Sequence, residues 1–451
     1  MTSYNAIYIA FGNFFRQACF FLAQIHIANS IGIGSFGLYS TLFSIILIWE
    51  AFGNLGSRMS LWKHIAKKSL HDDNKIIFYF VTRFIIAFTC LVLSYLFLSL
   101  VNFDESKFLV YFLIIILFNQ STFDWIFLSK GETSKVVIYN ITAGMFYLTF
   151  LYIYFLFNNN ILFLPLIFSL SFFLPGMYLI KNDILNFKGF KFTYLLKFQK
   201  ILIAHSKVYF GYDLIQRIYL SLPIILTFYV TNPILAGEFR LISLIIMLAV
   251  TLSTSLAFGF FNKIASHKNR DKNNSLSKAL LLILILVIPL SFYFEDVLSI
   301  NFLMMYIPKI LDVNDIVYAV SMLGIIAFAN ILRELLLPLG KTSTASISLV
   351  IFFVVFTILT FSYEVDSIIT LINFLVISEI LSLMFMLIYI NVISLCLNLF
   401  QNIYENAYII FSILILGLLS LLLELQTISL LMPLIHLFLV YRYVIKSRPN
   451  E

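Results

Sequence analysis

The sequence predicts an all-α protein that crosses a membrane about fourteen times. Hydrophobic residues make up 61% of the 451 residues and charged residues only 11%, whereas a soluble domain carries about a quarter charged residues. The apolar residues form fourteen long runs, each near or above the ~20 residues that a helix needs to cross a bilayer core. Only helices in this number satisfy their own backbone groups in lipid. The predicted spans are residues 5–31, 37–62, 76–101, 108–129, 136–157, 161–180, 201–230, 239–262, 279–300, 316–338, 346–363, 368–395, 407–424 and 428–444.

Basic residues are concentrated in every second loop between these runs. Twenty of the 29 Lys and Arg residues lie in loops on one side, and only Lys107 and Lys309 lie in loops on the other. Because cytoplasmic loops carry an excess of Lys and Arg, both termini are expected in the cytoplasm. We therefore expect a multi-pass protein of the bacterial inner membrane. This topology also explains the net charge of +7 without a nucleic-acid partner.

Two short echoes in the sequence predict an internal repeat. Gly, Phe, Leu and Ser coincide between Gly34–Ser40 and Gly237–Ser243, and Gly131–Ser134 is echoed by Gly340–Ser343. The order and offset favour a repeat of six helices. Because six is even, the repeats run the same way and the pseudo-two-fold axis lies along the membrane normal. The predicted organisation is a six-helix lobe at 1–180, a cytoplasmic interfacial linker at 181–200, a second six-helix lobe at 201–395, and two additional helices with a short cytoplasmic tail at 396–451.

Several ionisable side chains remain inside the predicted spans. Arg58, Arg83 and Arg240 lie within about two turns of a predicted helix end, where snorkelling explains them. The others each cost roughly 2.5–3.5 kcal/mol at a helix centre, so they are expected to face the bundle interior, one another or water. They are Arg16, Glu50, Asp124, Asp213, Arg217, Arg333, Glu334 and Glu379.

The first and seventh predicted helices each carry a polar face with an arginine near the middle. Helical spacing places Asn13, Arg16, Gln17 and Gln24 on one stripe of the first helix. On the seventh, one broad face holds Tyr212, Asp213, Gln216 and Arg217. These faces predict a hydrophilic cleft for an anionic group, because guanidinium binds phosphate oxygens in a bidentate fashion. The alternative is structural pairing, of Asp213 with Arg217 and of Arg16 with Glu50.

The remaining buried charges suggest two further roles. Glu50 and Glu379 lie near the middles of their helices, where a carboxylate can carry a proton or hold a sodium ion. Asp124, Arg333 and Glu334 lie near the cytoplasmic ends of the fourth and tenth helices. They predict either a cytoplasmic gate or bracing between helices.

Other chemistry is not indicated by the sequence. Gly340-Lys341-Thr342 resembles the end of a phosphate-binding loop but lacks the earlier glycine. Cys19, Cys90 and Cys396 are scattered in apolar segments, which favours neither disulfides nor a metal site. We therefore expect no metal, no cofactor and no enzymatic activity.

Several segments resemble the O-antigen and polysaccharide flippases of the multidrug/oligosaccharidyl-lipid/polysaccharide superfamily. They lie within about residues 1–345 and comprise Ile31–Ser40, Gly53–Gly56, Lys63–Ala66, Asp124–Phe127 and Ala236–Phe239. The resemblance implies a two-lobed transporter that moves an undecaprenyl-diphosphate-linked oligosaccharide between leaflets by alternating access. It also implies a polysaccharide polymerase and a chain-length regulator as partners.

Two rival functions fit the same topology. A drug/cation antiporter of this superfamily would favour acidic over basic residues in the cleft, and Arg16 and Arg217 argue against it. A membrane-embedded polysaccharide polymerase would carry a large outer loop with arginines, and the predicted outer loops contain none.

Overall fold

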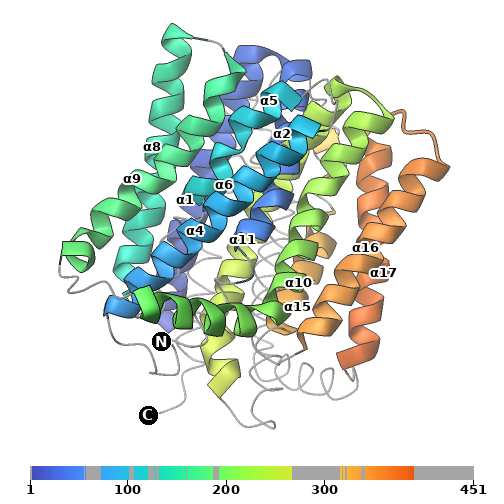
Figure 1. Ribbon diagram of the computed structural model, residues 1–451. Coiled ribbons are helices and arrows are strands. Elements are labelled where there is room, and N and C mark those ends of the chain that lie inside the picture. Colours follow the sequence, from blue (N-terminus) through green and yellow to red (C-terminus); the bar gives the residue numbers. More distant parts are fainter. Residues whose placement is uncertain are drawn as a thin grey trace, which may run out of the picture. The chain divides into compact units, whose positions relative to one another are not determined.

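The prediction of an all-α transmembrane protein is confirmed by a computed structural model (Figure 1). The structure describes residues 3–54, 56, 73–100, 106–119, 127, 132–158, 160–185, 192–266, 315–316, 318–319, 322–336 and 341–390. Within these ranges the secondary structure is helical and includes no strand. The two additional helices predicted within 396–451 lie outside the described residues.

The described part of the chain forms helices of varied length. In chain order they are α1 (Ser3–Ile31), α2 (Ile33–Asn54), α4 (Asp73–Leu100), α5 (Ser106–Phe112), α6 (Ile114–Asn119), α8 (Thr133–Phe157), η1 (Ile161–Phe163), α9 (Leu164–Leu185), α10 (Phe192–Val230), α11 (Pro233–Ser266), α15 (Leu323–Leu336), α16 (Thr342–Ser362) and α17 (Ile368–Ile390).

Six helical segments in the described part of the chain are long and apolar enough to cross a membrane. Shorter apolar stretches occur at Val81–Leu96 and Leu109–Phe118. Many large apolar side chains on these helices are exposed, such as Phe157 at 86% and Ile388 at 79%. Lipid contact explains this exposure, because a membrane-spanning helix needs no water-soluble outer face.

Two compact units divide the chain. One comprises Phe11–Arg240, and the other comprises Met1–Ala10 with Leu241–Glu451. The boundary near residue 240 therefore falls inside the unbroken helix α11. The seventh predicted span, which lies in α10, groups with the helices that precede it.

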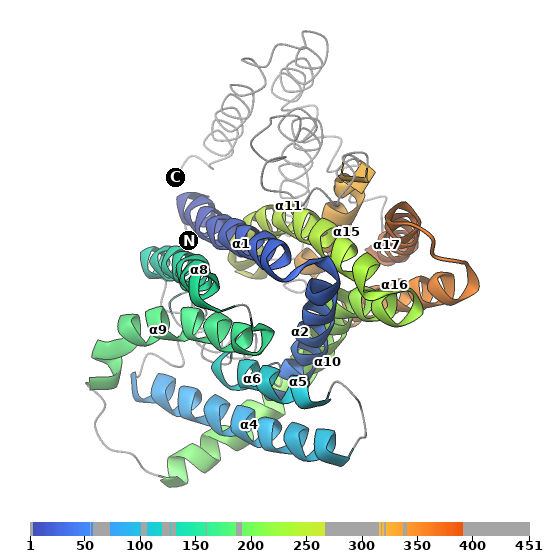
Figure 2. The same ribbon diagram turned by 90° about the horizontal axis from the view of Figure 1, so that it is seen from above.

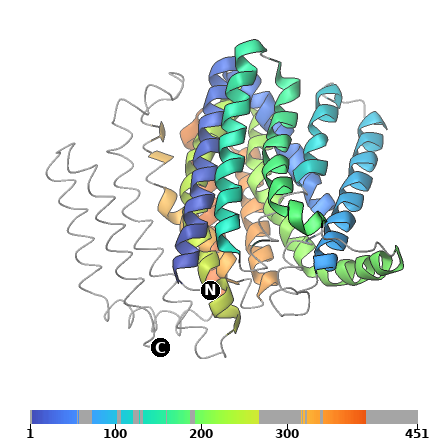
Figure 3. The same ribbon diagram turned by 90° about the vertical axis from the view of Figure 1, so that its left-hand side faces the viewer.

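Within Phe11–Arg240, α2 packs against both α10 and α4, and α8 packs against α9. Figure 2 shows α8 beside α9, and Figure 3 shows α1 running alongside α8. In the other unit, α16 packs against α17, and α15 contacts both. These contacts bring together polar side chains that are far apart in the sequence.

Helix α10 is longer than a membrane span requires. It runs for 39 residues without a break, although about 20 suffice for the bilayer core. Its first turns, within the predicted linker 181–200, turn away from the axis of the rest of the helix (Figure 1). The span itself is Tyr209–Val230 and contains Pro223.

Candidate functional site

The polar stripe predicted on α1 faces α8 and α9. Asn140 Nδ2 on α8 donates to Asn13 Oδ1 at 2.7 Å, and Gln24 Nε2 donates to the hydroxyl of Tyr147 at 3.0 Å. The Arg16 guanidinium lies over the ring of Phe172, 5.9 Å from its centroid. An arginine at this distance from an aromatic face is held by a cation–π attraction. Gln17 is half-buried on the same helix.

Close packing between α1 and α8 depends on glycine. A Cβ atom at Gly144 would lie 3.1 Å from the Cα of Arg16 and 3.2 Å from the Cβ of Cys19. At Gly12, a Cβ would lie 3.1 Å from the Cα of Val137. Small residues allow such approach between membrane helices. Gly144 thereby fixes the position of the Arg16 backbone.

A second group of polar side chains joins α2, α4 and α10. We call it the α2–α10 ion network, and it comprises Glu50, Asn54, Arg83, Asp213 and Arg217. Arg217 Nη1 and Nη2 donate to the two carboxylate oxygens of Glu50 at 2.9 and 3.2 Å. Arg217 Nε also lies 3.9 Å from Asp213 Oδ1. The network balances two carboxylates with two guanidinium groups.

Asn54 extends the network from α10 to α4. Its Nδ2 donates to Asp213 Oδ2 at 2.7 Å, and its Oδ1 accepts from Arg83 Nη2 at 2.8 Å. Arg83 is only 3% exposed, so the prediction that it snorkels to the interface is wrong. The reason is that α4 begins at Asp73, which places Arg83 about 15 Å along the helix.

The end of α2 is shaped to approach α10. Gly56 has a φ of +65°, and a Cβ there would lie 2.3 Å from the backbone nitrogen of Phe210. A left-handed glycine is the usual residue just after a helix end. The backbone contact brings Asn54 and Glu50 within reach of the charged face of α10.

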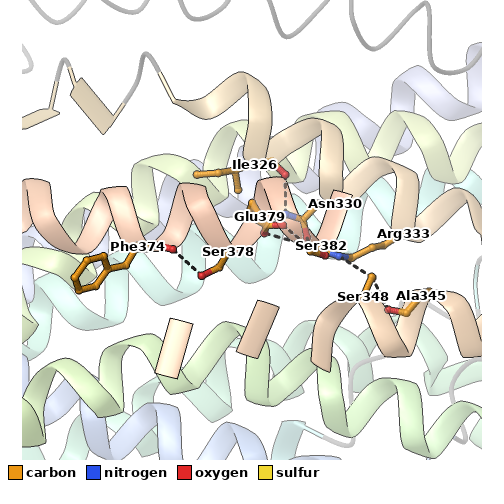
Figure 4. Close-up of polar contacts among 9 residues, drawn as sticks. All are labelled: Ile326, Asn330, Arg333, Ala345, Ser348, Phe374, Ser378, Glu379 and Ser382. Atoms are coloured by element: carbon orange, nitrogen blue, oxygen red, sulfur yellow. Dashed lines mark hydrogen bonds and ion pairs between the residues drawn. The ribbon is translucent and has the colours of Figure 1, made fainter. Parts of the chain in front are cut away.

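A third polar group lies in the unit that contains α15, α16 and α17 (Figure 4). Arg333 on α15 pairs with Glu379 on α17, and their side chains are 2% and 0% exposed. Arg333 Nη1 donates to Glu379 Oε1 at 3.2 Å and to Asn330 Oδ1 at 3.4 Å. Arg333 Nε and Nη2 donate to the hydroxyls of Ser348 and Ser382 at 3.3 and 2.7 Å.

The two paired arginines differ in how much of their binding capacity is used. A guanidinium has five N–H groups, and those of Arg333 meet Glu379 twice, Asn330, Ser348 and Ser382. Arg217 donates two hydrogen bonds, both to Glu50, and its side chain is 22% exposed. Arg333 therefore uses all five N–H groups, whereas Arg217 uses only two in hydrogen bonds and is less buried.

The structure regroups the residues predicted from the sequence. Arg217 and Asp213 were predicted to line the substrate cleft, whereas Glu50 was predicted to couple transport to an ion. In the structure, Arg217 pairs with both Glu50 and Asp213. Likewise, Glu379 from the predicted coupling pair meets Arg333 from the predicted gate. The described neighbours of these groups are Tyr212, which is buried, and Gln216 and Glu334, which are half-buried; Asp124 lies outside the described residues.

Sequence reasoning missed a further buried cluster, which we call the tyrosine cluster. It comprises Tyr39, Tyr147, Gln24 and Arg240. Tyr39 and Tyr147 are each 1% exposed, and Gln24 Nε2 donates to the Tyr147 hydroxyl at 3.0 Å. Arg240 acts electrostatically on both tyrosines. Tyrosines in membrane proteins suggest an interface belt, so sequence alone carried no signal for this cluster.

The described residues contain no group of three or more His, Cys, Asp or Glu side chains that could hold a metal ion.

Two comparisons with known proteins found no match: no protein-family model and no curated protein sequence matches the chain. Solved structures do match over most of the chain.

The matching structures are transporters. The lipid II flippase MurJ, in an inward closed conformation, superimposes with a TM-score of 0.66 and 14% identity, over 96% of this chain and 97% of that one. An outward-facing multidrug resistance MATE family transporter of the MOP superfamily gives 0.59 and 11%, over 91% and 96%. A MOP superfamily transporter from Pyrococcus furiosus gives 0.57 and 12%, over 87% and 96%. The chain therefore has the fold of MOP superfamily transporters.

Proposed function

We propose that this protein is a flippase that moves an undecaprenyl-diphosphate-linked oligosaccharide, such as an O-antigen repeat unit, across the bacterial inner membrane by alternating access. Both termini face the cytoplasm in this proposal. The matched MurJ protein is a lipid II flippase, and a multidrug resistance MATE family transporter has the same fold. The choice between these classes therefore depends on the charged side chains of this chain.

The observation that carries the proposal is the partly used guanidinium of Arg217. It lies in a membrane span, is 22% exposed, and keeps N–H groups beyond the two bonded to Glu50. A partly exposed guanidinium inside a membrane span is costly unless it serves a ligand or a partner. A diphosphate offers the paired oxygens that such a group binds best.

The proposed roles of the other residues follow from their positions. Arg16, held over Phe172, supplies a second cation on the polar stripe with Asn13, Gln17 and Gln24. Amide side chains of this kind suit the hydroxyls of a glycan, and the lipid tail stays in the bilayer. Glu50 remains the proposed coupling carboxylate, because it exchanges partners when Arg217 engages the headgroup.

The rival proposal, a drug/cation antiporter, rests on the carboxylates of the same network. Asp213 is 21% exposed and Glu50 is 5% exposed. If Arg217 moved away, the two carboxylates would offer negative charge to a cationic drug. The two functions predict opposite effects of removing Arg217, because that change would weaken anion binding and strengthen cation binding.

Binding of undecaprenyl diphosphate to purified protein in nanodiscs tests the proposal, with the neutral alcohol undecaprenol as the control ligand. Arg217→Ala combined with Glu50→Ala removes the guanidinium without leaving a buried carboxylate unpaired. We expect the double variant to bind the diphosphate about 10- to 100-fold more weakly, which corresponds to roughly 1.5–3 kcal/mol for a charge-assisted contact.

Arg217→Lys provides the matched control, since it keeps the charge and loses the planar fork. It should restore only part of the diphosphate affinity. Unchanged diphosphate affinity in the double variant would reject the anion site. Efflux of a cationic dye from cells that carry the protein, lost in Glu50→Gln, would support the antiporter instead.

A further inference from the structure

The first turns of α2 and α11 are in backbone contact. A Cβ atom at Gly37 would lie 1.8 Å from the carbonyl oxygen of Pro233 and 3.0 Å from the nitrogen of Gly237. Reciprocally, a Cβ at Gly237 would lie 2.4 Å from the carbonyl oxygen of Ile33. We call these four residues the glycine seam. No side chain larger than hydrogen fits at either glycine, so nothing can pass between the two helices there.

The two segments that meet at the seam are the two that echo each other in sequence. Phe36 and Phe239, which coincide in the echo, lie beside the seam and are 0% and 1% exposed. Gly34 and Ile234 flank it, with a Cβ at Gly34 lying 3.7 Å from Ile234 Cγ1. The two segments that are similar in sequence therefore also contact each other in the structure.

Two members of the tyrosine cluster lie close to the seam along their helices. Tyr39 follows Gly37 on α2 by two residues, and Arg240 follows Gly237 on α11 by three. The connections next to the seam, around Gly32 and Thr231–Asn232, carry no Lys or Arg. The positive-inside rule assigns such connections to the outer side of the membrane.

We infer that the glycine seam is the outer gate of the transport path, closed in this structure and parted when cargo leaves to the outside. The inference rests on the proposed alternating access. Backbone-to-backbone contact suits a gate, because glycine surfaces seal closely and separate without the withdrawal of interlocked side chains. The alternative is a fixed pivot that stays closed throughout the cycle.

A reversible disulfide across the seam tests whether the seam is a gate or a fixed pivot. In a background without Cys19, Cys90 and Cys396, the pair Gly34→Cys with Ile234→Cys offers a cross-link, because a Cβ at position 34 would lie 3.7 Å from Ile234 Cγ1. We expect the oxidised pair to lower delivery of surface polysaccharide at least tenfold and a reductant to restore it. Full delivery with the disulfide formed, together with equal access of an outside thiol reagent to Ser40→Cys in the oxidised and reduced proteins, would overturn the gate and favour the pivot.

A second cross-link provides the matched control. In Gly12→Cys with Val137→Cys, a Cβ at position 12 would lie 3.5 Å from the Cβ of residue 137, on α8. Both positions belong to Phe11–Arg240 and lie away from the seam. Because Gly12 packs closely against α8, the reduced form of this variant is its own reference. Oxidation should leave transport at the level of the reduced form, which would show that cross-linking neighbouring helices is not harmful by itself.

A labelling experiment reports on the gate without reference to any cargo. Ser40 lies one turn inside Gly37 on the same face of α2 and is 1% exposed. An impermeant thiol reagent added outside should label Ser40→Cys in reduced cells and at least tenfold more slowly when the seam is cross-linked. Equal rates would overturn the gate. A tenfold drop without any effect on polysaccharide would keep the gate and reject the proposed cargo.

Glycine substitutions give an independent check with no thiol at the seam. Gly37→Ala cannot close, because its Cβ meets a carbonyl oxygen at 1.8 Å, whereas Gly34→Ala makes ordinary contact at 3.7 Å. We expect Gly37→Ala to increase outside labelling of Ser40→Cys severalfold and Gly34→Ala to leave it unchanged. Identical labelling of the two alanine variants, at matched abundance, would contradict the gate.

Discussion

Arg217 and Arg333 are both arginines paired with a glutamate inside the membrane, yet their surroundings assign them different work. Arg333 uses all its donors in a site closed to solvent, which fits a brace between α15, α16 and α17. Arg217 donates two hydrogen bonds to the Glu50 carboxylate and lies 3.9 Å from the Asp213 carboxylate. Its side chain is 22% exposed. From burial and donor use, rather than charge alone, we propose that Arg333 is a structural brace and that Arg217 binds a ligand.

Substitutions at the brace should affect folding more than transport. Glu379→Gln removes the carboxylate that neutralises Arg333, and breaking such a buried pair costs about 3–5 kcal/mol. We expect lower abundance and a lower Tm in detergent. Arg333→Met combined with Glu379→Leu should recover both, because apolar residues of similar volume replace a buried pair at little cost.

Glu50→Gln is the matched control for that comparison. Its partner Arg217 is more exposed and also lies near Asp213, so the loss of Tm should be smaller. A larger loss in Glu50→Gln than in Glu379→Gln would contradict the assignment of the Arg333 site as the brace.

The sequence predicted which residues turn inward, because an unpaired charge facing lipid is expensive. It also predicted the contact of Asp213 with Arg217 from their spacing of four residues, and the two lie 3.9 Å apart. It could not identify partners on other helices. Glu50, for which Arg16 was the suggested partner, accepts both bonds of Arg217, 167 residues away. Such pairs depend on which helices pack together, and hydropathy carries no information about that.

At the scale of elements, the ends of α2 control how the helix meets its neighbours. Gly37 near its start approaches α11, and Gly56 just after its end approaches α10. The sequence placed the start of this span at residue 37, whereas α2 begins at Ile33. The difference arises because Gly32, with a φ of +81°, completes the turn from α1 in a single residue.

A pair of glycines tests the role of this packing. Gly56→Ala places a Cβ 2.3 Å from Phe210 and strains a left-handed backbone, whereas nothing lies within 4 Å of a Cβ at Gly211 on α10. We expect Gly56→Ala to separate α2 from α10 and lower the Tm. Gly211→Ala should be neutral or stabilising by up to about 1 kcal/mol, since alanine favours helix over glycine.

Thermal unfolding of both purified variants measures the difference. A Gly56→Ala protein as stable as Gly211→Ala would show that the backbone contact does not hold the α2–α10 ion network together.

At the scale of the whole molecule, hydropathy predicted an all-α membrane-spanning fold and the positions of most spans, whereas the transporter class of fold came from the repeat and the family resemblance. Residues 368–395, for example, were predicted as one span, and α17 covers Ile368–Ile390. The grouping of α10 with the preceding helices could not be predicted, because a repeat defines equivalent helices and not their contacts. The two-lobe organisation and the orientation stay predictions.

Cysteine labelling in intact cells tests the orientation. In a background without native cysteines, thiols placed at Lys68, Lys191 and Asp271 should resist an impermeant reagent, because the positive-inside rule assigns these basic loops to the cytoplasm. Thiols at Asn159 and Asp366 should react. A reversed pattern would invert the predicted topology, and a mixed pattern would change the number of spans.

The pairing of Arg333 with Glu379 also affects how the chain inserts into the membrane during synthesis. Arg333 enters the membrane in α15, but Glu379 is synthesised 46 residues later, a delay of roughly 2–9 s at typical elongation rates of about 5–20 residues per second. During that interval α15 carries a charge whose insertion costs roughly 2.5–3.5 kcal/mol. We therefore expect the nascent helix to linger beside the insertion machinery until α17 emerges, so that ribosome pausing between residues 333 and 379 would raise the fraction of chains degraded before assembly.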